Sequence, residues 1–299
     1  MTMSHPYFPG CTLANKAKSF DTAARAAAAA LGAPLDELPK WNCCGATFPL
    51  ATDNLLNLVG PTRILARAKQ HGDHVVTLCA ACYNVLKRTD QFLAAEPEKR
   101  ERINAFTEEP YNGGLRVLHL LEVLRDEVGF DALKSKVQKP LSGQRLAPYY
   151  GCLLLRPGAG VGLDDAENPT ILEALLAALG ATVMDFSHKT ECCGSYLVVS
   201  EPRLARELSY SIIAAAQRRK ATALVTSCPL CQFNLQSRQA EMEREHANFH
   251  PLPVVYFTEL LAEALGIGDR RPGSGVRPAI TPGAGESCPA ASSVKQSAG

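Results

Sequence analysis

The stretch ECCGSY at residues 191–196 and the related NCCGAT at residues 42–47 decide how this chain is organised. Each places two adjacent cysteines before a glycine, and three further cysteines accompany each pair. The first set is Cys11, Cys43, Cys44, Cys79 and Cys82, and the second is Cys152, Cys192, Cys193, Cys228 and Cys231. Four members recur 149 residues later and the first recurs 141 residues later, so the second copy holds eight extra residues. The spacing indicates an internal duplication.

The residues around the cysteines repeat as well. YFPGCTL matches YYGCLLL, and VVTLCAACYNVL matches LVTSCPLCQFNL. A repeat of this length is too long for a solenoid unit, whose period is about 20 to 50 residues. We therefore expect two homologous domains, at residues 1–140 and 141–267, with the boundary inside the Lys-, Pro- and Gly-containing segment 134–145. Residues 268–299 are rich in Gly, Pro, Ala and Ser, and we expect a disordered tail there.

Apolar segments alternate with amphipathic ones in both copies. In the second copy the predicted strands are RLAPYYG, ATVMDF, ALVTS and PVVYF, and the predicted helices are NPTILEALLAALG, EPRLARELSYSIIAAAQRRKA and CPLCQFNLQSRQAEMERE. The first copy repeats this order, ending in LRVLHLLEVL where the second has PVVYF. Such alternation predicts an α/β fold, with a parallel, Rossmann-like sheet in each domain.

The composition narrows the class of function. Lys and Arg total 31 against 30 Asp and Glu, with no dense basic stretch, so nucleic acid is not an expected partner. The N-terminus has no secretion signal, and no segment is apolar enough for a membrane span, so we expect a cytoplasmic protein. Eleven cysteines in a reducing compartment favour metal binding or redox chemistry over disulfides.

The predicted fold brings each set of cysteines together. Functional groups of an open α/β sheet gather at the carboxyl ends of the strands, and each cysteine group follows a predicted strand. The two cysteines of each CxxC lie at a helix start, where they share a face and the helix dipole favours thiolates. Each copy therefore offers five thiolates to one site.

Five thiolates exceed the needs of a common metal site. A structural zinc ion or a cubane cluster takes four protein ligands. Adjacent cysteines tend to point apart, but they can reach two irons of a larger cluster. We expect Gly45 and Gly194 to let the backbone approach such a cluster and to direct an amide N–H at a sulfur. Zinc at either site remains an alternative, because tetrathiolate geometry suits it too.

The pattern resembles the CCG-domain (cysteine-rich domain) family, and the two-copy arrangement is similar to the B-type subunit of heterodisulfide reductase. The resemblance covers about residues 5 to 265 and implies that each five-cysteine motif binds one non-cubane [4Fe-4S] cluster. It further implies an oxidoreductase that cleaves or forms a disulfide of a small thiol substrate. Because the chain lacks a ferredoxin motif, electrons would pass through a ferredoxin-type iron-sulfur partner, similar to the family's C-type subunit, within a larger flavin-containing complex.

Two other functions stay open. One is a CCG electron-transfer subunit of a lactate-utilisation or glycolate-oxidase-type dehydrogenase, and the other is a zinc-stapled scaffold. His188 and Lys189, just before the second cysteine pair, are candidate proton donors, although solvated loop side chains are the simpler interpretation. Cys288, in the predicted tail, is interpreted as incidental.

Overall fold

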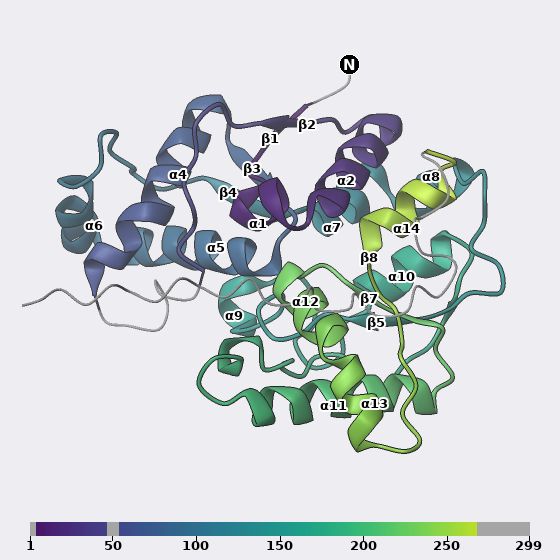
Figure 1. Ribbon diagram of the computed structural model, residues 1–299. Helices are drawn as coiled ribbons and strands as arrows, with labels where there is room; N and C mark the ends of the chain where they lie inside the picture. The colour runs from purple at the N-terminus through teal and green to yellow at the C-terminus, as the bar shows by residue number, and fades with distance from the viewer. Residues whose placement is uncertain (1–3, 47–53, 268–299) are drawn as a thin grey trace, which may run out of the picture. The chain divides into compact units, whose positions relative to one another are not determined.

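The computed structural model describes residues 4–46 and 54–267, whose helices and strands form two sets (Figure 1). The first set is β1 (His5–Tyr7), α1 (Gly10–Asn15), α2 (Lys18–Leu31), β2 (Leu35–Glu37), η1 (Leu55–Leu58), α4 (Val59–His71), β3 (His74–Thr77), α5 (Ala80–Ala95), α6 (Pro97–Asn104), β4 (Arg116–His119), α7 (Leu120–Glu122), the π-helix η2 (Val123–Val128) and α8 (Phe130–Ser135). The second set is β5 (Arg145–Tyr149), α9 (Gly158–Val161), α10 (Ile171–Ala178), β6 (Thr182–Val183), η3 (Ser195–Leu197), α11 (Pro202–Arg218), β7 (Ala223–Thr226), α12 (Pro229–Ser237), α13 (Gln239–Glu245), β8 (Val254–Tyr256) and α14 (Phe257–Ala264).

Each copy builds one four-stranded parallel sheet, and the strand order is the same in both. The order is β2-β1-β3-β4 in the first copy and β6-β5-β7-β8 in the second. Thr77 of β3 is in register with His119 of β4, and Thr226 of β7 with Tyr256 of β8. The predicted α/β fold with an internal duplication is confirmed.

The first long helix shows how local sequence produces this packing. α2 buries Phe20, Ala24, Ala27 and Leu31, which recur at helical spacing on one face. The helix ends because Gly32 adopts a left-handed conformation, with φ of 88°, and its amide donates to carbonyls of the last turn. The alanine-rich run is thus a packed helix.

Two predicted elements differ from the structure. LRVLHLLEVL is a strand only as far as His119, because the Nδ1 atom of His119 accepts the amide of Leu121 while Glu122 accepts the amide of His119, which starts a helix. CPLCQFNLQSRQAEMERE forms two helices that meet at Arg238. The side chain of Gln239 is buried there and bonds the backbone of Leu252 in both directions.

The last helices of the two copies pack reciprocally. α14, which follows β8, lies on α2 of the first copy, and α8, which follows β4, lies on α10 of the second. Phe20 of α2 stacks on Tyr256 at 4.3 Å between ring centroids, and the hydroxyl of Thr258 donates to the carbonyl of Phe20. The buried side chains of both copies form one continuous core. α14 was not among the predicted helices.

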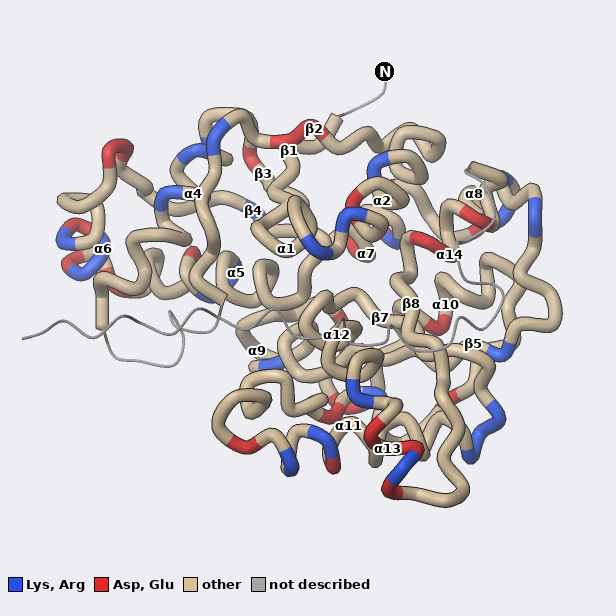
Figure 2. Tube along the Cα trace, in the orientation of Figure 1, with Lys and Arg blue, Asp and Glu red and all other residues tan. Residues whose placement is uncertain are grey.

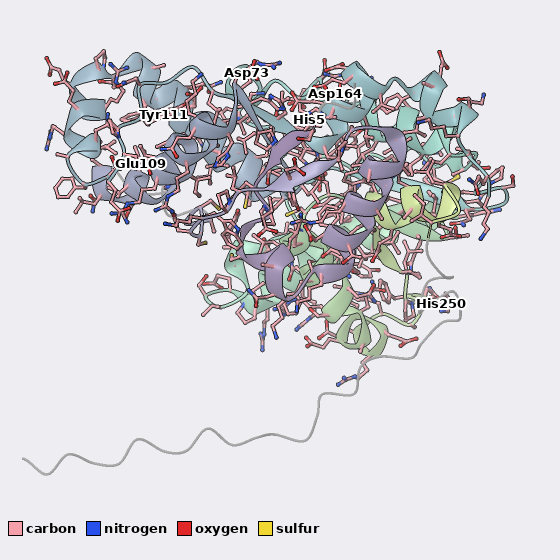
Figure 3. All side chains as sticks on the ribbon, turned by 90° about the horizontal axis from the view of Figure 1, so that it is seen from above. His5, Asp73, Glu109, Tyr111, Asp164 and His250 are labelled. Carbon is pink, nitrogen blue, oxygen red and sulfur yellow. The ribbon has the colours of Figure 1, made fainter. Side chains whose placement is uncertain are left out.

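Polar side chains meet at the amino ends of β1 and β3; two of them, His5 and Asp73, are labelled in Figure 3. Nδ1 of His5 lies 2.9 Å from Nε2 of His74, whose Nδ1 lies 2.7 Å from Asp73. Burial lowers the pKa of His5. This edge of the first sheet is therefore held by histidines, whereas the cysteines lie at the opposite edge.

The charged residues are distributed over outer elements in both signs, including α6 and α13 (Figure 2). Within residues 4–46 and 54–267 we find no helix that combines the length and the apolar character needed to cross a bilayer. The predicted tail, with Cys288, lies outside the described residues.

Candidate metal centre

The ten motif cysteines occupy corresponding places in the two copies. Each group lies where a parallel strand ends, which is the carboxyl edge of its sheet. Cys11 is in α1 directly after β1, and Cys152 follows β5. Cys79 and Cys228 are the residues immediately before α5 and α12, so both CxxC pairs begin a helix after a central strand. The adjacent pairs lie in the loops after β2 and β6.

The thiols of the first motif form a chain of neighbours. Sγ of Cys11 lies 3.6 Å from Sγ of Cys43, and Sγ of Cys44 lies 3.4 Å from Sγ of Cys82. Side-chain hydrogen bonds also join Cys43 to Cys44, and Cys79 to Cys82. All five sulfurs are thereby connected, with Cys11 and Cys43 exposed and the other three buried.

The thiols of the second motif form two groups of neighbours and are less exposed. Sγ of Cys193 lies 3.5 Å from Sγ of Cys231, which is also hydrogen-bonded to Cys228. Cys152 is hydrogen-bonded to Cys192. None of these five thiols is exposed; Cys152 and Cys192 are half-buried.

Hydrogen bonds between thiols separate them into stronger and weaker acids. The bond from Cys43 lowers the pKa of Cys44 to about 4, and the bond from Cys152 lowers the pKa of Cys192 to about 6. Conversely, the bonds that Cys43 and Cys152 make to these neighbours raise the pKa of both donors. Thiolates beside thiol donors are ready metal ligands, because metal binding releases the remaining protons.

The glycines after the cysteine pairs direct amides at sulfur. The N–H of Gly45 donates to Sγ of Cys43, and that of Gly194 to Sγ of Cys192, both at 3.4 Å. Their φ angles of 84° and 78° are the left-handed values that glycine tolerates best. A side chain at Gly194 would meet Ala205 of α11, so the room there serves helix packing and not a close approach to the sulfurs.

Two glycines outside the predicted site residues also lie against the thiols. A Cβ atom on Gly10 would lie 2.9 Å from Sγ of Cys82, and one on Gly151 would lie 3.2 Å from Sγ of Cys231. Both residues have positive φ, at 75° and 66°. The signal was present in the repeat, because a glycine precedes the first cysteine in YFPGCTL and in YYGCLLL.

The two candidate proton donors have different surroundings. His188 is half-buried, beside Ser187 and 3.9 Å from Glu191. Lys189 is buried, and its ammonium lies 2.8 Å from Glu173 and 3.0 Å from Asp185. The interpretation of Lys189 as a solvated loop side chain is therefore wrong: its charge is neutralised in an ion-pair cluster.

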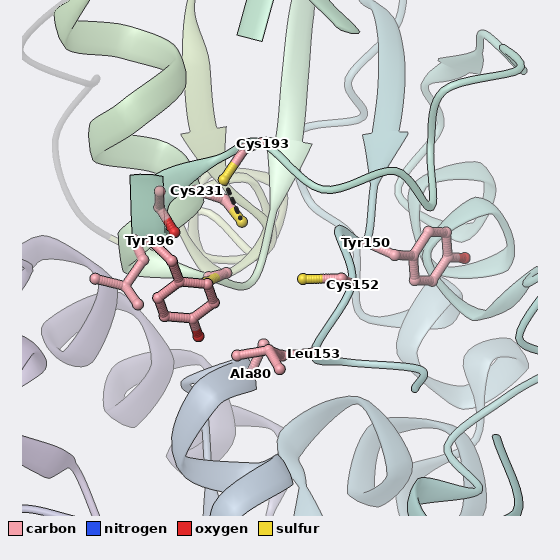
Figure 4. Close-up of a pocket in the computed structure, with 10 residues that line it drawn as sticks. Ala80, Tyr150, Cys152, Leu153, Cys193, Tyr196 and Cys231 are labelled. Atoms are coloured by element: carbon pink, nitrogen blue, oxygen red, sulfur yellow. Dashed lines mark hydrogen bonds between the residues drawn. The ribbon is translucent and has the colours of Figure 1, made fainter. Parts of the chain in front are cut away.

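A shallow pocket borders the second motif (Figure 4). Its lining includes four thiols, those of Cys152, Cys193, Cys228 and Cys231, and no charged side chain. Leu153, Leu230, Tyr150, Ser195 and Tyr196 supply most of the remaining wall. Ala80, which stands between the CxxC cysteines of the first motif, closes the pocket, so the two motifs adjoin there.

The donor set fits an iron-sulfur cluster. Thiolates are the ligands that iron-sulfur clusters use, and each motif gathers five thiols at the carboxyl edge of its sheet. The hydroxyls of Thr77 and Ser227, close to the two CxxC pairs in sequence, are buried and have no hydrogen-bond partner, as expected of donors beside an inorganic sulfur site. Among the described residues, no three His, Cys, Asp or Glu side chains are arranged around a single metal ion.

Comparison with known proteins agrees with this geometry. The family model of the CCG cysteine-rich domain matches twice, at residues 6–87 and 146–236. A hypothetical protein from Helicobacter pylori shares the fold, with a TM-score of 0.71 at 11% identity over 89% of this chain and 49% of that one.

Two curated relatives are similar over almost their whole length. The 8-methylmenaquinol:fumarate reductase membrane anchor subunit of Wolinella succinogenes is 36% identical over 89% of this chain and 94% of its own. The B-type subunit of the ferredoxin/F420H2-dependent CoB-CoM heterodisulfide reductase of Methanosarcina acetivorans is 27% identical over 87% and 88%. This chain therefore belongs to the CCG cysteine-rich domain family, and it carries the domain in two copies.

Proposed function

We propose that this chain is the iron-sulfur subunit of a multi-subunit oxidoreductase, with one cluster at each five-cysteine motif. The observation that carries the proposal is the convergence of ten cysteines into two sets of five at the carboxyl edges of two matching sheets. When bound, such a cluster supplies one-electron transfer. The family resemblance favours a non-cubane [4Fe-4S] cluster at both sites.

For the reaction, we propose first the cleavage or formation of a disulfide. The relatives named as heterodisulfide reductase subunits match 87% of this chain at 26% and 27% identity, and both cysteine motifs are complete here. A disulfide takes up two electrons and two protons to give two thiols, so two one-electron centres suit the couple. The electrons would come from an iron-sulfur partner subunit.

A second reaction is favoured by the higher identity, 36%, to a subunit named for a quinol:fumarate reductase. In that case the chain would pass electrons from a quinol, which releases two electrons and two protons, towards the reduction of an organic acid. This candidate lies close to the dehydrogenase alternative drawn from the sequence.

Metal analysis with EPR on anaerobically purified protein tests the cluster proposal. We expect about eight irons per chain, four for each [4Fe-4S] cluster. Stoichiometric zinc without iron would instead support a zinc-stapled scaffold and overturn the proposal. Replacement of Cys193 by Ser should remove about half of the iron, because one of two sites is lost.

Reoxidation of the reduced protein separates the two reactions. A small disulfide and a water-soluble menaquinone analogue are each mixed with dithionite-reduced protein, and the cluster absorbance is followed. Faster reoxidation by the disulfide supports disulfide chemistry, and faster reoxidation by the quinone supports the quinol-linked reaction.

A further inference from the structure

The side chain of Asn84 joins the two cysteine motifs. Asn84 lies on α5, two residues after Cys82, and is fully buried. Its Nδ2 donates to the carbonyl of Leu153 at 2.7 Å and to that of Arg156 at 2.6 Å. Leu153 directly follows Cys152, so this one amide holds a segment of the first motif against a segment of the second.

The amide can only be oriented in one way. Both partners are carbonyl oxygens, which accept, so the group facing them must be the NH2 of Asn84, and both of its hydrogens are used. The Oδ1 atom is buried and has no hydrogen-bond partner in the structure. The two donated bonds therefore fix the side chain of Asn84 between the two carbonyls.

The connection continues to the adjacent cysteine pair. The guanidinium of Arg156 donates to the carbonyl of Thr190, two residues before Cys192. A path of backbone and hydrogen bonds thus runs from Cys82 through Asn84 and Arg156 to the loop that carries Cys192 and Cys193.

The same helix makes peripheral contacts that avoid the cysteines. Gln91, two turns further along α5, donates to the carbonyl of Gly160, and Tyr83 donates to that of Val161. These contacts hold α9, which lies in the part of the second copy that contains its eight extra residues. Gln91 is thus a matched control for Asn84 on the same interface.

We propose that Asn84 is a positioning residue that sets the separation of the two cluster sites and hence the coupling between them. The inference rests on the proposed function, because it requires a cluster at each motif. The closeness of the motifs supports it, because Ala80, between the CxxC cysteines of the first motif, lines the pocket that four thiols of the second motif also line. Electrons that enter at one motif would then cross at this contact.

The test compares Asn84→Leu, Asn84→Thr and Gln91→Leu with the wild type as full-length, anaerobically purified proteins. Iron is counted first, and EPR spectra are then recorded at potentials where each cluster alone, and then both, are paramagnetic. The magnetic interaction is the departure of the two-cluster spectrum from the sum of the single-cluster spectra.

We expect a magnetic interaction between the clusters in the wild type and in Gln91→Leu. Asn84→Leu should lose this interaction at unchanged iron content. Asn84→Thr, which keeps one donor, should retain part of it. Additive spectra in the wild type, an unchanged interaction in Asn84→Leu, or equal loss in Gln91→Leu overturns the inference. Loss of iron from both Asn84 variants also overturns it, since Asn84 would then serve cluster binding and not spacing. Wild-type protein without iron contradicts the proposed function itself, which is a distinct result.

Discussion

At the scale of single residues, two separate constraints favour glycine at the position before the first cysteine of each copy. Gly10 and Gly151 adopt left-handed φ angles, and each faces a thiol of its own motif. Gly32 shares the left-handed conformation, but nothing lies within 4 Å of a Cβ placed there. A comparison of substitutions at Gly10 and at Gly32 therefore distinguishes the effect of backbone strain from that of contact with a thiol.

We expect Gly10→Ala to lose about half of the bound iron, because the added methyl would displace Sγ of Cys82. Gly32→Ala should cost about 1 to 2 kcal/mol of stability through backbone strain alone and keep its iron. Iron analysis together with thermal unfolding measures both effects. Equal iron in the two variants would show that the approach to Cys82 is unimportant.

His119 gives a pH dependence that can be measured. Burial lowers the pKa of its imidazole to about 4, below the 6.5 expected in the unfolded chain. The folded state therefore binds fewer protons between these values, so the stabilisation is complete above pH 6.5 and is lost as the pH falls towards 4. The difference between the two pKa values corresponds to about 3 kcal/mol in the free energy of unfolding, at 1.36 kcal/mol per pKa unit.

We expect His119→Asn to flatten this part of the pH profile. Asparagine is a good N-cap and retains an acceptor for the first turn of α7, but it does not titrate. Denaturant unfolding between pH 7 and 4.5 measures the free energy of unfolding of both proteins. An identical slope in both would mean that other groups cause the acid sensitivity.

At the scale of elements, the loop that carries the second cysteine pair is held from outside the motif. The carbonyl of Lys189 accepts the amide of Tyr150 at the end of β5, while its ammonium pairs with Glu173 of α10. The position of this loop after a strand was predictable, but Lys189 and Glu173 are 16 residues apart and neither copy has a motif that links them. Such a contact depends on how α10 packs on the sheet.

Replacement of Lys189 by Met should destabilise the protein by about 3 kcal/mol, because the largely buried carboxylate of Glu173 would lose its cationic partner and keep only the hydroxyl of Tyr150. His188→Gln, at the neighbouring half-buried position, should leave the melting temperature almost unchanged. Proton donation by Lys189 predicts a different pattern, in which Lys189→Met keeps its stability and loses only turnover. Thermal unfolding and iron content distinguish the two.

At the scale of the whole molecule, the duplication and the α/β class were predictable because spacing and periodicity repeat along the chain. The cysteine sets were also predictable, since parallel strands bring their carboxyl ends together. The reciprocal packing of α14 on α2 and of α8 on α10 was not. The sequence of α14, FTELLAEA, does not indicate which copy its apolar face will cover.

We expect neither residues 1–140 nor residues 141–267 to fold when expressed alone. Phe20 and Phe257 are both fully buried, and each half would expose one of them together with the surface that it covers. Co-expression of the two halves should restore a protease-resistant complex. Circular dichroism and limited proteolysis report on this, and a stable, cooperatively unfolding single half would contradict it.

The reciprocal packing of α8 and α14 also indicates how a chain with only one copy of the domain could complete its core. Its own last helix would have no first helix of another copy to cover, so two such chains would complete each other by donating helices across a twofold axis. The arrangement in this protein is therefore that of a domain-swapped dimer whose two subunits are joined in one chain. Fusion frees the two halves to differ, so one site can retain exposed sulfurs at Cys11 and Cys43 while the other encloses its own.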